Sequence, residues 1–225
     1  MAVIEIENLR KEYRGEGETV TVLENLSMKV EDHSIVSVEG ASGVGKSTLL
    51  NIIGTIDSSS GGIIHIQGKE VTAMNEKQKE NFRASTLGFI YQHHFLLPDF
   101  TVLENVMMPL LILRRPILLS RKEAADALDL VGLSHRLEHY PSQISGGEMA
   151  RAGVARALVG GKKLILADEP TGNLDKGNSD KLADLLWKLQ KELQFTLMIV
   201  THDMDLASRV PVRYRLLRGL LEPIS

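Results

Sequence analysis

Hydrophobic and polar positions alternate near the start of the chain. Residues 3–9 and 26–30 alternate between apolar and polar side chains, which is typical of antiparallel strands with one solvent-facing side. Residues 35–38 and 63–66 are short β-rich runs next to glycines, and residues 87–91, 164–167 and 197–200 are apolar enough to be buried strands. The later runs alternate with helical stretches, so we expect an α/β fold with parallel strands and crossover helices.

Three helices are predicted by capping boxes, in which Ser or Thr is followed three residues later by Glu. The pairs are Thr101 with Glu104, Ser120 with Glu123, and Ser145 with Glu148. Because all three lie close together, we expect one domain, 1–225, in which a helical subdomain, 93–159, is inserted into an α/β core, 1–92 and 160–225. A further long helix is predicted by an apolar stripe at helical spacing: Leu182, Leu185, Leu186, Leu189 and Leu193.

Composition limits the functions that the chain can have. The net charge of −3 gives no general attraction to nucleic acid, and the lack of cysteine excludes disulfides and thiolate metal sites. The first seven residues do not resemble a signal peptide, and the apolar run 106–113 is too short to span a membrane. These features fit a cytosolic protein with no direct membrane span, so a membrane role would require a partner.

A complete phosphate-binding loop follows the predicted strand at 35–38. The pattern Gly-x-x-x-x-Gly-Lys-Ser, between a strand and a helix, lets backbone N–H groups and a helix N-terminus surround phosphate oxygens. Lys46 would contact the β- and γ-phosphates, and the Ser47 hydroxyl would bind Mg²⁺. We expect ATP or GTP to bind at these residues: Gly40, Ala41, Ser42, Gly43, Val44, Gly45, Lys46, Ser47 and Thr48.

Two acidic residues end the buried strand predicted at 164–167. Asp168 is placed to hold the Mg²⁺ shell, and Glu169 could polarise an attacking water molecule. Taken alone, the pair could equally be a strand that leaves the core through acidic residues. The phosphate-binding loop upstream favours the catalytic interpretation.

A second anion site is predicted at Ser145, Gly146, Gly147 and Glu148, where a serine N-cap and two glycines begin a helix. Alone, this segment could be an ordinary capped helix. One chain has little use for two phosphate sites unless two chains share each nucleotide, so the order of these motifs predicts a homodimer.

These motifs together resemble the ABC ATPase family over nearly the whole chain. The resemblance rests on the phosphate-binding loop, Gln92, the segment 144–148, Asp168 with Glu169, the segment 173–175, and His202. It implies a P-loop NTPase (RecA-like) core with an N-terminal antiparallel β subdomain and an inserted α-helical subdomain. It also implies ATP and Mg²⁺ as cofactors, ATP hydrolysis coupled to transport, and integral membrane permease subunits as partners.

The resemblance also implies a role for individual residues. Tyr13 would stack on adenine, and Gln92 would touch Mg²⁺ and the attacking water. The segment from Ser145 to Glu148 would clasp the γ-phosphate bound to the other subunit. Three further roles are implied for acidic and histidine side chains: Glu169 as general base, His202 as γ-phosphate sensor and Asp175 in the subunit contact.

A narrower resemblance lies in the segment 87–106, followed by Met108 and Pro109. It is similar to the ATPases of lipoprotein-releasing (Lol) systems, which implies a Lol-like pair of integral membrane subunits as partners. It also implies that this chain is a peripheral protein at the cytoplasmic face of the inner (plasma) membrane. ATPases of macrolide exporters and of cell division share the same frame, and they remain the alternative. A small-molecule kinase would share the phosphate-binding loop, but it would not explain the Ser-Gly-Gly segment.

The residues after Gln92 form an apolar cluster with a single charge. Phe95, Leu96, Leu97, Pro98 and Phe100 surround Asp99 and precede the helix expected at Thr101. Such a cluster is either core or a docking groove for a partner segment. We expect His93 and His94, immediately before it, to lie on the loop surface.

Overall fold

The computed structural model describes residues 2–15 and 17–224, which form two compact units. The first comprises residues 1–83 and 196–225, and the second comprises residues 84–195. Within the described ranges no helix is both long and apolar enough to cross a membrane.

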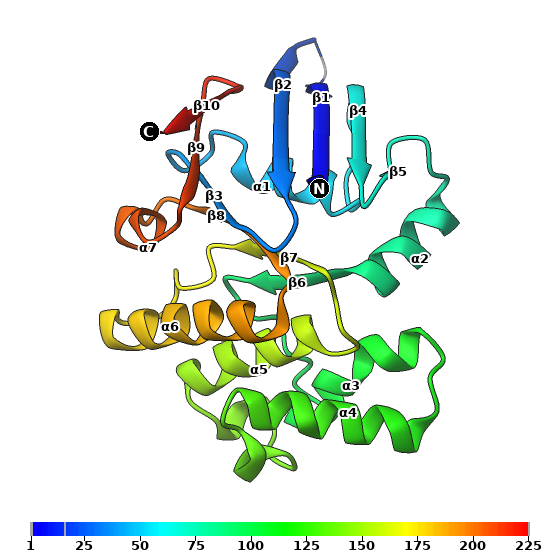
Figure 1. Cartoon of the computed structure of the whole chain (residues 1–225), viewed down its shortest axis with the longest axis vertical. Coiled ribbons are helices and arrows are strands. Elements are labelled where there is room, and N and C mark those ends of the chain that lie inside the picture. The colour runs from blue at the N-terminus through cyan, green and yellow to red at the C-terminus, as the bar shows by residue number, and fades with distance from the viewer. Residues whose placement is uncertain (1, 16, 225) are drawn as a thin grey trace. The chain divides into compact units, whose positions relative to one another are not determined.

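An antiparallel sheet in the first unit contains both strands that were predicted from alternating residues (Figure 1). Its strand order is β2 (Thr19–Glu31), β1 (Ala2–Arg14), β4 (Gly61–Ile66) and β5 (Lys69–Glu70). The strand β1 is longer than predicted. Its pairing with β2 shifts register between Ile6 and Leu9 and again before Lys11, and such irregularities break the alternation on which the prediction depended.

The parallel strands of the first unit position its loops at one sheet edge. Strand β3 (Ile35–Glu39) pairs in parallel with β8 (Thr196–Thr201) and β9 (Val212–Leu217), and β10 (Leu220–Ile224) is antiparallel to β9. All five residues of β3 are buried, as expected for a strand covered on both faces. The helix α1 (Lys46–Ile53) follows β3, and α7 (Met204–Ser208) follows β8. The α/β fold with parallel strands is confirmed.

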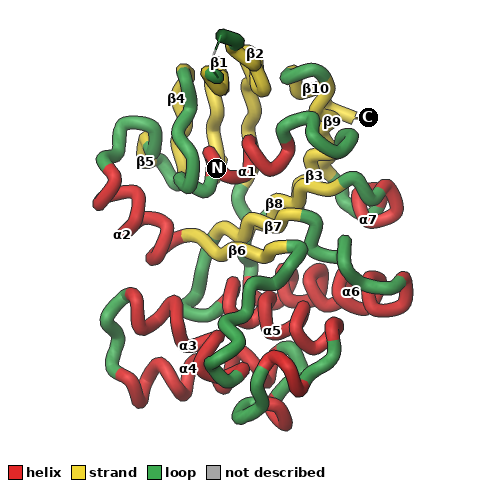
Figure 2. Tube along the Cα trace, turned by 180° about the vertical axis from the view of Figure 1, so that it is seen from behind, coloured by secondary structure: helices red, strands yellow, loops and turns green. Residues whose placement is uncertain are grey.

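The second unit combines a parallel strand pair with helices. Strand β6 (Leu87–Tyr91) pairs in parallel with β7 (Leu164–Asp168). The helices α3, α4 and α5 pack against one another (Figure 2). The bounds of the helical elements are α3 Val102–Ile112, α4 Ile117–Leu130, α5 Gly146–Leu158 and α6 Lys176–Leu193, with 3₁₀ turns at Ser134–Arg136 and Pro141–Gln143. The remaining helix, α2 (Glu76–Thr86), carries the chain from the first unit into the second.

The close approach of α5 to β6 explains why residue 88 is a glycine. A Cβ atom added to Gly88 would lie 2.1 Å from the carbonyl oxygen of Ala157 in α5. Only glycine leaves room for the helix backbone at that distance, so Gly88 sets how closely α5 packs on β6.

Two of the three predicted capping boxes are confirmed, at Thr101 for α3 and at Ser145 for α5. The third prediction is wrong, because α4 begins three residues before Ser120, directly after Pro116. Pro116 is the N-cap residue, and its extended ψ angle of 135° places the start of the helix at Ile117. Glu123 therefore does not cap the helix, and its carboxylate instead accepts two hydrogen bonds from Arg115 at 2.8 and 3.0 Å.

The long helix predicted from the leucine stripe is confirmed as α6, Lys176–Leu193. Leu182, Leu186 and Leu189 are buried, whereas Leu193, in the last turn, is 42% exposed. The helix ends at Leu193, and Gln194 follows in a left-handed conformation.

Candidate nucleotide-binding site

The predicted phosphate-binding loop joins β3 to α1 in a tightly curled conformation. Gly43 and Gly45 have φ angles of 79° and 110°, which favour glycine. A Cβ atom on Gly45 would lie 2.7 Å from Cγ1 of Val22, and one on Gly40 would lie 2.7 Å from the carbonyl oxygen of Leu216. The loop can therefore close only with glycines at these positions.

Lys46 and the start of α1 provide positive charge inside this loop. The buried Lys46 side chain donates hydrogen bonds from Nζ to the carbonyl oxygens of Gly40 (2.9 Å) and Ala41 (3.1 Å). Gly45, at the N-cap of α1, has no side chain that could accept from the first-turn N–H groups. The exposed Ser47 lies in that same first turn. N–H groups, a helix dipole and a lysine together form a cradle that suits phosphate oxygens.

His202 lies at the same sheet edge as the phosphate-binding loop. In the parallel pairing of β3 with β8, Glu39 is opposite Thr201. The next residue of each chain segment is therefore Gly40 on one strand and His202 on the other. His202 is exposed, and Asp203 after it caps α7 by accepting hydrogen bonds from two backbone N–H groups. The structure thus brings together two site predictions that are far apart in the sequence.

Tyr13 is held by a small polar cluster at the end of β1. Its hydroxyl group donates a hydrogen bond to Asp57 (2.8 Å), and the Nζ atom of Lys11 lies 4.6 Å from the ring centroid. Lys11 also donates to Asp57 at 2.7 Å. Burial raises the pKa of the Asp57 carboxyl group, but the hydrogen bonds from Lys11 and Tyr13 outweigh it and hold this pKa below its usual value. The contacts with Asp57 and Lys11 fix the orientation of the Tyr13 ring, while 45% of the residue surface remains exposed.

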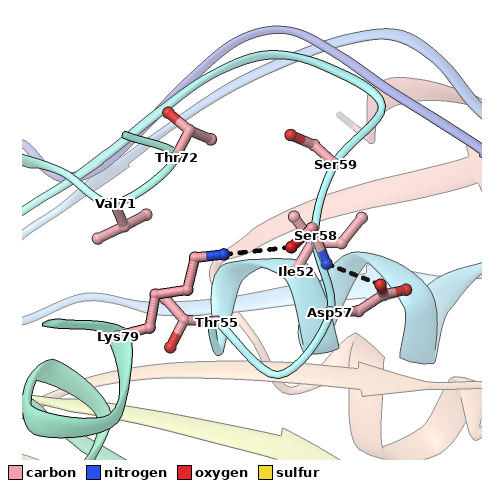
Figure 3. A pocket seen from close by; sticks show the side chains of 8 residues that line it. All are labelled: Ile52, Thr55, Asp57, Ser58, Ser59, Val71, Thr72 and Lys79. Atoms are coloured by element: carbon pink, nitrogen blue, oxygen red, sulfur yellow. Dashed lines mark hydrogen bonds between the residues drawn. The ribbon is translucent and has the colours of Figure 1, made fainter. Parts of the chain in front are cut away.

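A small pocket lies beside Asp57 (Figure 3). Its cavity volume is about 60 Å³, and Lys79 reaches across it to donate a hydrogen bond to the Ser58 hydroxyl at 3.1 Å. Sites for drug-sized ligands typically measure several hundred Å³, roughly 300–1,000. This pocket is too small for a nucleotide base, so the exposed ring of Tyr13 remains the candidate contact for adenine.

The second unit gathers Gln92, Asp168 and Glu169 at the ends of β6 and β7. Tyr91 is opposite Asp168 in this parallel pair, so Gln92 and Glu169 are the next residues of the two strands. Glu169 is buried, and its φ angle of 46° is unusual for a residue other than glycine. Backbone strain of this kind tends to occur at functional sites.

Asn173 makes contacts with Gln92 that the sequence analysis missed. Its Nδ2 atom donates to the Gln92 carbonyl oxygen at 2.9 Å, and its Oδ1 atom accepts from Nε2 of Gln92 at 3.2 Å. The sequence placed Asn173 in a motif, but no spacing rule links it to a residue 81 positions earlier. Only the fold of this unit brings the two amides together.

The segment from Ser145 to Glu148 forms a reciprocal cap on α5. The Ser145 hydroxyl oxygen accepts from the Glu148 N–H at 3.3 Å, and the Glu148 carboxylate accepts from the Ser145 N–H at 2.8 Å. Arg136 donates to the same carboxylate at 2.8 Å. Hydrogen bonds from the Ser145 backbone, the Ser145 hydroxyl and Arg136 lower the pKa of Glu148 to about 2. Ser145 and Gly146 remain exposed, so a second molecule can reach this helix end.

Comparison with known proteins identifies the family. Residues 23–172 match the family model described as ABC transporter. The chain is 44% identical over 223 residues to the lipoprotein-releasing system ATP-binding protein LolD of Pseudomonas fluorescens, covering 99% of this chain and 98% of that protein. It is 45% identical over 220 residues to LolD of Pseudomonas syringae pv. tomato, covering 98% and 97% of the two chains.

The chain belongs to the ABC transporter family.

The solved structures agree with this assignment. A dimeric structure of the ATP-binding cassette MJ0796 in a post-hydrolysis state, bound to ADP and Pi, has a TM-score of 0.89 and 33% sequence identity. The match covers 99% of both chains. A second dimeric structure of MJ0796 gives the same TM-score with 35% identity. The predicted ABC ATPase fold and the use of ATP are therefore confirmed.

In this ABC transporter ATPase, the apolar cluster after Gln92 is largely on the surface. Phe95, Leu97 and Phe100 are 60%, 41% and 40% exposed, so these three side chains are not core. The backbone that carries them is fixed by the buried Asn105, whose Nδ2 atom donates to the carbonyl oxygens of Leu97 and Phe100 at 3.0 Å. We call Phe95, Leu97 and Phe100 the apolar patch.

His94, which precedes the apolar patch, is buried, so the prediction that it lies on the loop surface is wrong. Its backbone is held in place because Arg156 donates to its carbonyl oxygen and to that of Phe95. Burial lowers the pKa of the His94 imidazole. His93, by contrast, is exposed, as expected.

Proposed function

We propose that this chain is the ATPase subunit of a lipoprotein-releasing ABC transporter, which uses ATP hydrolysis to drive release of lipoproteins from the inner membrane. The observation that carries the proposal is the similarity to LolD proteins over nearly the whole chain, with 44% sequence identity over 223 residues to one of them. The match includes the segment after Gln92, where the Lol-like sequence pattern and the apolar patch coincide.

We assign the phosphate-binding loop, Gly40 to Thr48, to the phosphates of ATP and the exposed ring of Tyr13 to adenine. Ser47, Gln92 and Asp168 would hold Mg²⁺. Their hydroxyl, amide and carboxylate oxygens are the hard ligands that this ion prefers. When bound, Mg²⁺ supplies neutralising charge at the β- and γ-phosphate oxygens.

For the hydrolytic step, Glu169 accepts a proton from the water molecule that attacks the γ-phosphate. Gln92 orients that water molecule, and His202 contacts the γ-phosphate. Phosphoryl transfer needs positioning and charge stabilisation more than covalent chemistry, which fits side chains that end rigid parallel strands.

Two copies of the chain would share each nucleotide. In this arrangement Ser145, Gly146, Gly147 and Glu148 of one subunit contact the γ-phosphate held by the partner, and Asp175 lies in the subunit contact. The exposure of Ser145 and Gly146 supports this role. The solved structures of the related cassette MJ0796 are dimeric.

The membrane partners would be a pair of integral permease subunits of the Lol type, with no nucleic acid involved. The helical segment 93–159 would receive a short helix of a permease subunit on the apolar patch, while residues 1–92 and 160–225 form the nucleotide-binding core. The ATPase would then be a peripheral protein at the cytoplasmic face of the inner membrane.

Purification of the native complex from detergent-solubilised membranes, with mass spectrometry of the co-purifying chains, tests the proposal. We expect two permease subunits and lipoprotein release that depends on ATP. Recovery of a macrolide-exporter permease or a cell-division membrane protein instead would contradict lipoprotein release and favour the alternative.

A further inference from the structure

Asn173 contacts both the main chain and the side chain of Gln92. Its Nδ2 atom donates to the Gln92 carbonyl oxygen (2.9 Å), and its Oδ1 atom accepts from Gln92 Nε2 (3.2 Å). The same Nδ2 atom lies 3.1 Å from Nδ1 of the His93 ring. The Asn173 NH₂ group therefore has an acceptor in the Gln92 carbonyl oxygen, and the Asn173 oxygen has a donor in Gln92 Nε2.

These contacts fix which way the Gln92 amide is turned. A backbone carbonyl oxygen can only accept a hydrogen bond, so the Asn173 NH₂ group must face it. The Asn173 oxygen then faces Gln92, which must present its own NH₂ group. The Oε1 atom is the polar atom of Gln92 that this pairing leaves for another partner.

Gly172 provides the space in which this pairing forms. A Cβ atom at residue 172 would lie 2.8 Å from Nε2 of Gln92 and 3.1 Å from its Cδ atom. The Gly172 N–H donates to the Glu169 carbonyl oxygen at 3.0 Å, so a turn directly after Glu169 places Asn173. The positions of Glu169 and Gln92 are thus linked through one short turn.

We propose that Asn173 is a positioning residue that turns the Gln92 amide so that Oε1 is presented to the magnesium ion of the bound nucleotide. The inference rests on the proposed function, in which Gln92 is a magnesium ligand. Amide oxygen is a suitable ligand for Mg²⁺, whereas the NH₂ group is not. An amide turned the other way would present hydrogen atoms to the cation.

The test measures the affinity of the full-length chain for the non-hydrolysable ATP analogue AMP-PNP, with Mg²⁺ and with EDTA, by isothermal titration calorimetry. Asn173→Ala should leave the affinity for AMP-PNP in EDTA unchanged. It should reduce the magnesium-dependent gain, which is the increase in this affinity when Mg²⁺ is present, roughly three- to tenfold, as expected for loss of one hydrogen bond. Lys181→Ala, at an exposed position on α6, is the control and should match the wild type.

Two further variants separate positioning from a general structural effect. Gly172→Ala should fold, since it displaces only the flexible end of Gln92, and should reduce the same magnesium-dependent gain. In the double variant Gln92→Ala/Asn173→Ala the loss should equal that of Gln92→Ala alone, because Asn173 acts through Gln92.

Additive losses, or an unchanged magnesium-dependent gain in Asn173→Ala when Gln92→Ala reduces it, would overturn the positioning role and leave the proposed function intact. If Gln92→Ala also leaves the gain unchanged, Gln92 is not a magnesium ligand. In that case the assignment of Gln92 under the proposed function fails together with the inference.

Discussion

Single residues at the ends of the parallel strands adopt conformations that are unfavourable elsewhere in a protein. Gly45 has a φ angle of 110°, and Glu169 is a buried residue other than glycine with a φ angle of 46°. Such conformations cost of the order of 1–3 kcal/mol for a non-glycine residue and persist where the surrounding structure enforces them. Their occurrence at the phosphate-binding loop and at the proposed general base fits a function that depends on exact positioning.

Substitution of Lys46 by alanine should abolish ATP hydrolysis while the chain remains folded. A hydrogen bond to a charged group contributes roughly 1.5–3 kcal/mol, and no other side chain of the loop carries a positive charge. Steady-state phosphate release gives the rate, and circular dichroism checks the fold. Lys188→Ala, on the exposed face of α6, should retain wild-type activity. Near-normal hydrolysis by Lys46→Ala would contradict the assignment of the loop.

At the scale of elements, the sequence predicted the features that depend on interactions between residues close together in the chain. Strand β6 has the predicted bounds 87–91, and the caps at Thr101 and Ser145 form as expected. The Ser120 prediction failed because Pro116 starts the helix earlier, and the burial of His94 depends on contacts from α5, which lies about 60 residues later. The pairing of Asn173 with Gln92 could not be predicted for the same reason, since it is a long-range contact.

The cap of α5 should make stability depend on pH through Glu148. Its pKa in the folded chain is about 2, against an ordinary value of 4.5. The stabilisation is therefore present above pH 4.5 and is lost as the pH falls toward 2. Glu148→Gln should lower stability at neutral pH by about 0.3–1 kcal/mol, the usual effect of a charge at a helix N-terminus.

Thermal unfolding of both proteins between pH 7 and pH 3 measures this effect. The difference in melting temperature between wild type and Glu148→Gln should be constant above pH 4.5 and shrink below it. A difference that does not change with pH would show that the charge of Glu148 does not stabilise the cap.

The loop between β6 and α3 should determine partner binding. Replacing Leu97 and Phe100 by serine removes two exposed apolar side chains, each of which would contribute up to about 1.5–3 kcal/mol when fully buried by a partner. Because Asn105 holds the loop backbone, the fold should be unaffected. We expect less permease to co-purify, with ATP binding unchanged.

Ile112→Ser provides the matched control, because Ile112 is also exposed and apolar but lies at the opposite end of α3. It should retain the permease. Full retention of the permease by the Leu97→Ser/Phe100→Ser variant would mean that the apolar patch is not the docking surface.

At the scale of the whole molecule, predicted site residues occur in each unit of the chain. The phosphate-binding loop, Tyr13 and His202 belong to the first unit, whereas Gln92, Asp168 and Glu169 belong to the second. Ser145 and Gly146 also belong to the second unit, where they leave the start of α5 exposed to another molecule. A shared site would make hydrolysis depend on a second copy of the chain, and it would let the nucleotide control association of the two copies.

The most direct test of this account is the mass of the Glu169→Gln variant, measured by size-exclusion chromatography with light scattering. Glutamine keeps the shape of the side chain but cannot accept the proton, so ATP should bind without being hydrolysed. We expect the mass of one chain without nucleotide and twice that mass at saturating ATP. Adding Ser145→Arg should prevent the dimer while ATP binding is retained. A Glu169→Gln variant that keeps the mass of a single chain at saturating ATP would contradict the shared nucleotide site.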